Sequence, residues 1–225
     1  ALSKSFNTAV VVEPKPGGNG AVAMEYIINQ PSDGHTVLIA SHDIQTSFPL
    51  LYNTTKYSDK ISPLVPIWKT DLFLVTSSKI QTFNELVELS KVKPISYGSW
   101  GIGSISHIDS ARFAQQTGIT ATHVPYKDYG QWFQDLSNQQ LAYSFATTSS
   151  TRALEQAGKL KWHAIAAAKR DPKYPNIPTV KELTGKEVIG GPNLAFYINK
   201  DVPAERVAVL TTAIEEALKN ETVSN

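Results

Sequence analysis

The sequence predicts an α/β protein with mostly parallel sheets, and three observations support that prediction. Short apolar runs rich in β-branched residues alternate with segments whose apolar residues recur every three or four positions, the patterns of buried strands and of amphipathic helices. Glycine and proline lie between these segments, where turns need them. The 225 residues are 41% hydrophobic and 18% charged, which suits one large domain or two modest ones.

The apolar runs give the expected strands, namely residues 9–13, 36–40, 95–97, 122–126, 141–145 and 163–168, with further strand-like runs in 64–77 that end at 72–75. The helical spacing gives the expected helices, namely residues 20–29, 82–91, 104–117, 129–139, 149–157 and 203–220. Suitable helix-capping and helix-ending residues stand at their boundaries, namely Thr82, Ser104, Gly118, Gly158 and Pro203. With a loop at 14–20 and a turn at 31–34, the first strand, helix and strand predict a right-handed βαβ unit.

Composition excludes several classes of protein. The net charge is +1, from 21 basic and 20 acidic residues, and no basic cluster stands out, so we expect no nucleic-acid partner. No apolar run approaches the roughly 20 residues that span a bilayer, so we expect a chain that is not inserted in a membrane. The absence of cysteine excludes disulfides, thiolate metal sites and cysteine nucleophiles. We expect no cofactor.

The stretch from Tyr97 to His107 is the most informative part of the chain. Its glycines follow the order G-x-x-G-x-G, which is neither the dinucleotide order nor a P-loop. They allow a tight turn, and Ser104 can cap the helix that follows. A helix start of this kind presents free N–H groups and the positive end of the dipole to a small anion. An ordinary strand-to-helix turn is the alternative reading.

Polar loops also follow the other expected strands, at residues 41–43, 126–130 and 147–149. Ligands of α/β proteins bind at such loops, yet none of these holds an obvious acid–base pair. Ser99, His107 and Asp109 have the residue types of a hydrolase triad but lack the G-x-S-x-G elbow. His42 and Asp43 could be a metal pair, although no third ligand lies near them in sequence.

Six segments in order resemble the Bug/TctC family, the extracytoplasmic receptors of tripartite tricarboxylate transporters. They are the run at 10–13 with its Pro-Gly-Gly loop, Pro31-Ser32-Asp33-Gly34-His35-Thr36-Val37-Leu38, Tyr97-Gly98-Ser99 with Gly103-Ser104 and His107, His123-Val124-Pro125-Tyr126-Lys127, Ala157-Gly158-Lys159-Leu160, and Ile177-Pro178-Thr179-Val180. The resemblance covers nearly the whole chain.

The resemblance implies a type II periplasmic binding-protein fold, with two lobes, mixed and mostly parallel sheets, and a ligand cleft between the lobes. The first lobe would comprise residues 1–76 and 192–225, without the first strand of the family, and the second lobe residues 77–191. The implied function is a monomeric, periplasmic, non-enzymatic receptor that captures a small mono-, di- or tricarboxylate, aliphatic or aromatic, for membrane transporter subunits. The signal peptide would lie outside this sequence.

The resemblance also implies which residues hold the ligand. Ser99, Gly103 and Ser104 would form the anion site of the second lobe, with Thr147 on a facing loop, and Ser41 would contribute from the first lobe. His42, Asp43 and Trp100 stand where the family has small residues. We expect His42 and Asp43 to adjust ligand choice toward a group that forms hydrogen bonds, and Trp100 to add a stacking face or narrow the cleft. Tyr126 and Asn193 complete the predicted ligand-binding set.

Two other functions remain open at this stage. The ligand-sensing domain of a transcription regulator has a similar two-lobed fold, and it would need a DNA-binding segment upstream. An α/β hydrolytic enzyme is the other alternative, although no convincing acid–base pair is visible.

Overall fold

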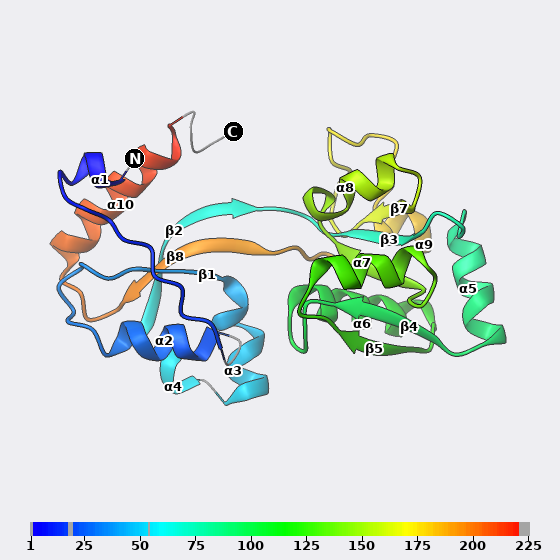
Figure 1. Cartoon of the computed structure of the whole chain (residues 1–225), viewed down its shortest axis with the longest axis horizontal. Helices are drawn as coiled ribbons and strands as arrows, with labels where there is room; N and C mark the ends of the chain where they lie inside the picture. Colours follow the sequence, from blue (N-terminus) through cyan, green and yellow to red (C-terminus); the bar gives the residue numbers. More distant parts are fainter. Residues whose placement is uncertain (1, 18–19, 54, 221–225) are drawn as a thin grey trace. The chain divides into compact units, whose positions relative to one another are not determined.

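The computed structural model describes residues 2–17, 20–53 and 55–220, which form two compact units (Figure 1). Unit 1 is Ala1–Lys69 with Asn193–Asn225, and unit 2 is Thr70–Pro192. The chain therefore passes from unit 1 to unit 2 after Lys69 and not after residue 76. The reason is that strand β3 (Phe73–Ser77) pairs with two strands of unit 2.

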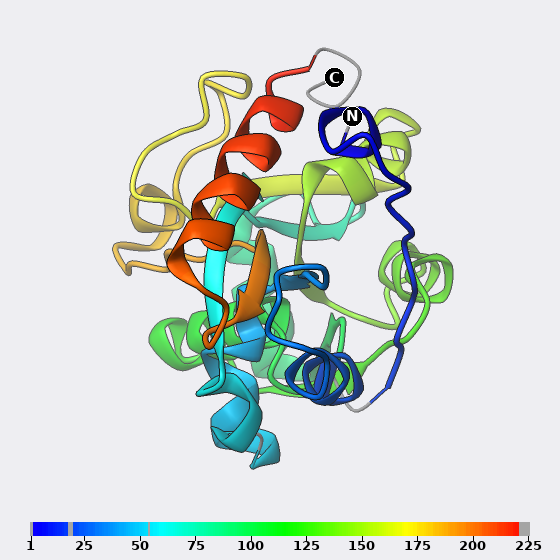
Figure 2. The same cartoon turned by 90° about the vertical axis from the view of Figure 1, so that its left-hand side faces the viewer.

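Unit 1 contains a three-stranded antiparallel sheet in the order β1 (Leu38–Ser41), β8 (Asn193–Asn199), β2 (Ile61–Lys69). Successive side chains of β8 point to opposite faces. Tyr197 packs with Met24 of helix α2 (Ala21–Ile28). Phe196 packs with Ile214 of helix α10 (Ala204–Leu218), which lies along β2 and β8 (Figure 2). The two helices therefore cover the two faces of this sheet.

The predicted strand at 9–13 is wrong. Val10, Val11 and Val12 are 43%, 75% and 85% exposed, and no strand of the described chain pairs with them. A β-branched run favours extended backbone, but a strand needs a hydrogen-bonding partner. The βαβ unit predicted for residues 9–40 is therefore not formed by the described residues of that segment. Strand 36–40 exists as β1, and it pairs antiparallel with β8, which sequence patterns did not predict.

The described residues of unit 1 also form four short helices, namely α1 (Leu2–Ser5), the 3-10 helix η2 (His42–Ile44), α3 (Ser47–Tyr52) and α4 (Thr55–Ser58). None of them was predicted. Within the predicted loop at 14–20, Gly18 and Asn19 lie outside the described residues. In the part of the chain that the structure describes, no helix has both the length and the apolar character needed to cross a bilayer.

Unit 2 contains a mixed five-stranded sheet in the order β5 (Ala121–Pro125), β4 (Ile95–Ser99), β6 (Tyr143–Ala146), β3, β7 (Leu160–Ile165). Strand β4 is parallel to β5 and β6, whereas β3 is antiparallel to β6 and β7. Among the strands of the described chain, parallel pairing therefore involves three strands of one sheet, a smaller share than expected. One isolated parallel bridge joins Ile165 and Thr179.

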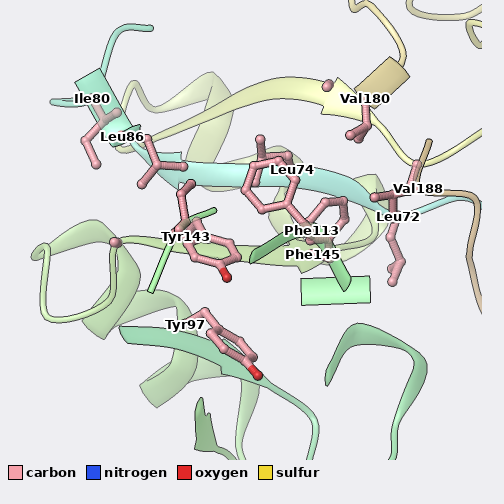
Figure 3. Packing of buried hydrophobic residues seen from close by; sticks show 14 of the residues in the cluster. Leu72, Leu74, Ile80, Leu86, Tyr97, Phe113, Tyr143, Phe145, Val180 and Val188 are labelled. Atoms are coloured by element: carbon pink, nitrogen blue, oxygen red, sulfur yellow. The ribbon is translucent and has the colours of Figure 1, made fainter. Parts of the chain in front are cut away.

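The helices of unit 2 are α5 (Phe83–Val92), α6 (Ile105–Thr117), α7 (Tyr129–Ser137), α8 (Thr148–Gln156) and the unpredicted α9 (Val180–Thr184). Phe113 of α6 packs among Leu74 and Phe145 in one core cluster (Figure 3). Trp132 of α7 packs with Phe73 in another. Because neighbouring residues of β3 join different clusters, α6 and α7 cover opposite faces of the sheet.

Candidate anion-binding site

Three strand-to-helix loops of unit 2 meet at one edge of its sheet. Strands β4, β5 and β6 are parallel and in register, with Ser99 opposite Pro125 and Gly98 opposite Ser144. Their carboxyl ends therefore lie together, which is where open α/β sheets bind ligands. The Tyr126 N–H donates to the Ser99 carbonyl oxygen at 2.9 Å, so the first two loops are directly bonded.

The loop between β4 and α6 turns on glycine and is closed by the predicted cap. Gly101 and Gly103 have φ of 121° and 82°, values that favour glycine. The Ser104 side chain accepts from the His107 N–H and donates to the Gly101 carbonyl oxygen at 2.8 Å. The expectation of a Ser104 N-cap with a helix end at Gly118 is confirmed.

Two N–H groups at the start of α6 remain available. The first four N–H groups of a helix have no partner within it. The His107 N–H bonds to Ser104 Oγ and the Ile108 N–H to the Ser104 carbonyl oxygen. Within the described residues, no hydrogen bond uses the N–H groups of Ile105 and Ser106. These donors stand at the positive end of the helix dipole.

The hydroxyl groups of this turn are bonded to the turn itself. Ser99, which is fully buried, lies with its Oγ 2.6 Å from His123 Nε2 and 3.1 Å from both the N and O of Gly101. Ser106 Oγ accepts from the Trp100 N–H at 3.2 Å and lies 3.1 Å from Ser104 Oγ. Ser99 and Ser104 therefore shape the turn with their side chains.

Two stacked imidazoles lie beneath the turn. The rings of His107 and His123 stack with their centroids 4.0 Å apart, and Tyr97 stacks on His123 at 5.2 Å. Burial lowers the pKa of His107. Burial and the nearby His107 lower the pKa of His123 to about 4. Both rings are therefore neutral at pH 7, and His107 Nδ1 accepts a hydrogen bond from the Gly103 N–H at 3.0 Å.

The remaining predicted residues of unit 2 lie on the neighbouring loops. Tyr126 donates its hydroxyl to Asp135 at 2.7 Å, and burial raises its pKa. Thr147 caps α8 by accepting from the Ser150 N–H. Trp100 is 45% exposed and stacks on Tyr129 at 4.2 Å.

The predicted residues of unit 1 gather where β1 and β8 pair. Ser41 lies opposite Leu194, and the Asn193 N–H donates to His42 Nδ1 at 3.3 Å. The Ser41 Oγ and Asn193 Oδ1 atoms are buried and have no hydrogen-bond partner among the described residues. Asp43 is buried, with its Oδ1 3.7 Å from His42 Nε2.

The two chemical alternatives raised by the sequence, a hydrolase triad and a metal site, can be compared with this geometry. Ser99 contacts His123 and not the His107 of the imagined triad, and Asp109 is fully buried within α6. A buried serine whose oxygen is bonded to its own turn is a poor nucleophile. Within the described chain, no three His, Asp or Glu side chains group as metal ligands.

Sequence reasoning did not single out two residues that contact the turn. One is His123 of β5, whose contact with Ser99 depends on the register of β4 and β5. Ser106 was not singled out, although a serine two positions beyond a cap commonly bonds to backbone near a helix start. A hollow of about 720 Å³ lies between α7 and α8. Its lining includes Tyr129 and Gly130 of the predicted loop at 126–130, but none of the ten residues of the predicted ligand-binding set.

A family model described as the tripartite tricarboxylate transporter family receptor, TctC, matches residues 1–225. A UPF0065 protein of Bordetella pertussis is 25% identical over 221 residues, covering 96% of this chain and 68% of that protein. Protein BugT of Bordetella pertussis is 24% identical over 229 residues, covering 99% of this chain and 70% of its own length. A UPF0065 protein of Bordetella bronchiseptica is 24% identical over 219 residues, and the chain spans 65% of its length.

Solved structures show the same fold. An R. palustris protein with adipate has a TM-score of 0.86 at 24% identity, covering 99% of this chain and 76% of that chain. MatC from Rhodopseudomonas palustris with bound malate has a TM-score of 0.82 at 23% identity, covering 99% of this chain and 78% of that chain. The periplasmic binding protein BugD has a TM-score of 0.80 at 24% identity, covering 99% of this chain and 76% of that chain. The fold is therefore the two-lobed α/β fold of periplasmic binding proteins, as predicted.

Proposed function

This chain belongs to the tripartite tricarboxylate transporter receptor family, and on that basis we propose that it captures a small carboxylate anion for a membrane transporter of the tripartite type. The proposal includes a periplasmic location, a monomeric state and binding without turnover. The observation that supports it most directly is the pair of available N–H groups on Ile105 and Ser106 at the start of α6.

A carboxylate suits these donors for electrostatic reasons. Hydrogen bonds from backbone N–H groups to a carboxylate are charge-assisted and stronger than neutral ones. The helix dipole adds a favourable contribution within the first turn. Because His107 and His123 are neutral at pH 7, the attraction comes from oriented backbone and needs no cationic side chain.

The rigidity of the turn also supports binding. The hydroxyl groups of Ser99, Ser104 and Ser106 are already bonded to the loop. They hold the amides of α6 in place before a ligand arrives, which lowers the ordering cost of binding. Adipate and malate, carried by the two R. palustris relatives, are dicarboxylates, and we extend that ligand class to this chain.

The test is calorimetric titration of the chain with mono-, di- and tricarboxylates, beginning with adipate and malate. We expect at least one dissociation constant near micromolar, or about −8 kcal/mol. If no member of the panel releases or absorbs heat on binding, and none shifts the thermal midpoint, the proposal is wrong.

The Ile105→Pro variant tests whether the anion binds to the N–H group of residue 105. Proline is well tolerated at the first position of a helix, and Ser104 already has the extended backbone (φ −63°, ψ 155°) that a following proline requires. The variant removes one N–H donor and should weaken carboxylate binding about tenfold or more, the worth of a hydrogen bond to a charged group. Ile105→Ala is the matched control, because it loses the side chain and keeps the N–H. Equal affinities in the two variants would show that this amide does not contact the ligand.

A further inference from the structure

Two large aromatic rings are exposed together beside the α6 turn. Trp100 belongs to the β4–α6 loop, and Tyr129 is the first residue of α7. Their rings stack at 4.2 Å with an interplanar angle of 17°. Trp100 is 45% exposed and Tyr129 49%. A packed aromatic side chain buries about 150–250 Å², so this half-exposed pair leaves flat apolar surface in water at the candidate site.

The exposed pair is the outer end of an aromatic stack that reaches the core. Tyr129 also stacks on Trp132 at 5.9 Å and 15°, and on Phe133 at 5.8 Å and 20°. Trp132 and Phe133 are 2% and 3% exposed. The planes are nearly parallel from Trp100 inward, and among the described residues Tyr129 is the one ring stacked on Trp100. A stack anchored in this way fixes the orientation of its outermost ring.

A hydrogen bond connects the backbone of Trp100 to the start of α6, where the two N–H donors lie. The Trp100 N–H donates to Ser106 Oγ at 3.2 Å, so the backbone of Trp100 is bonded to the first turn of α6. Among the described residues, no heavy atom beyond the chain neighbours lies within 4 Å of the position that a Cβ on Gly101 would take. A flat ring and two N–H groups that have no partner among the described residues therefore belong to one short turn.

We propose that the Trp100–Tyr129 pair makes this site select a carboxylate attached to an aromatic ring, with the ring stacked on Trp100 and the carboxylate bonded to the α6 amides. This inference rests on the proposed function, since it names the ligand class of the same site. Aromatic faces also attract cations, but the positive end of α6 favours an anion. Offset stacking favours a planar ring over a puckered ring of similar size.

The test compares benzoate with cyclohexanecarboxylate, which have the same charge and the same ring size but differ in planarity, and includes adipate as an open-chain ligand. Titration of the chain should show benzoate binding about two- to tenfold more tightly than cyclohexanecarboxylate, the range of aromatic pair energies. Trp100→Leu should bring that ratio close to one and leave the affinity for cyclohexanecarboxylate nearly unchanged.

Trp68→Leu is the matched control, because Trp68 is 44% exposed and lies on β2 of unit 1. It should keep the wild-type ratio. The inference is overturned if wild type binds adipate but shows no preference for benzoate, or if Trp100→Leu retains the preference; the proposed function survives both results. If wild type binds none of the three ligands or any other carboxylate, both proposals fail.

Discussion

The polar clusters of the two units differ in where their unused hydrogen-bonding capacity lies. In unit 2 the hydroxyl groups of Ser99 and Ser104 are bonded within the turn, and the N–H groups of Ile105 and Ser106 have no partner among the residues that the structure describes. In unit 1 the oxygens of Ser41 and Asn193 are buried without a partner in the described chain. The turn of unit 2 therefore has fixed backbone donors, whereas the cluster of unit 1 has side-chain oxygens without a partner among the described residues.

This difference separates the role of each cluster in stability from its role in binding. A serine that completes a turn stabilises the fold, so replacing it leaves buried groups without partners. A buried hydroxyl with no partner costs free energy, so replacing it is neutral or stabilising. The same substitution, serine to alanine, is therefore expected to act in opposite directions in the two units.

Ser99→Ala should have the largest effect on stability. It removes the acceptor of the Gly101 N–H and the partner of His123 Nε2, and should lower the free energy of unfolding by about 1–3 kcal/mol. Urea unfolding measures the change. Ser149→Ala is the control, because the hydroxyl of Ser149 contacts Thr147 in an exposed position, and should cost under about 0.5 kcal/mol. Equal losses in both variants would contradict the assignment of Ser99 to the turn.

Acid should destabilise the fold through histidines that all lie in unit 2. The pKa of His123 is lowered to about 4 by burial and by His107, and that of His163 to about 4 mainly by burial. An unfolded histidine titrates near 6.5. Between pH 6.5 and about 4 the unfolded chain therefore binds protons that the folded chain does not, and stability falls as pH falls.

The measurement is the urea midpoint at several values between pH 7.5 and 4.5, a window that limits the contribution of carboxyl groups. His123→Asn should flatten the profile below pH 6.5, because one depressed imidazole is removed. An unchanged midpoint across this window in the wild type would contradict the burial of these rings. His163 lies 2.8 Å from Thr76 Oγ1, away from the turn, so its contribution should persist in the His123 variant.

Local signals in the sequence were sufficient for much of unit 2. Ser104 and Gly118 mark the two ends of α6 by chemistry that acts within a few residues, and Thr82 caps α5 as predicted. The strand predicted at 9–13 failed because pairing is a property of distant residues. Strand β8 was missed for the same reason, since it pairs with β1 across more than half of the chain.

The candidate site likewise combines features set by adjacent residues with features set by distant ones. The glycine turn and its cap could be predicted, since both depend on adjacent residues. The contact of Ser99 with His123 depends on strand register, and the stacking of Trp100 on Tyr129 joins two loops. Neither could be read from spacing. The assignment of ligand-contacting residues remains a prediction.

Ser41→Ala should have the smallest effect on stability and is the sharpest test of the contrast. Its Oγ is buried and has no partner in the described residues, so the free energy of unfolding should change by no more than about 0.5 kcal/mol or should rise. Because the family resemblance implies that Ser41 contacts the ligand, calorimetry should nevertheless show weaker carboxylate binding. A loss of stability as large as that of Ser99→Ala, with unchanged affinity, would mean that Ser41 serves the fold of unit 1 in the way that Ser99 serves unit 2. The two clusters would then be equivalent in construction, and the division between fixed donors and unpaired side chains would be wrong.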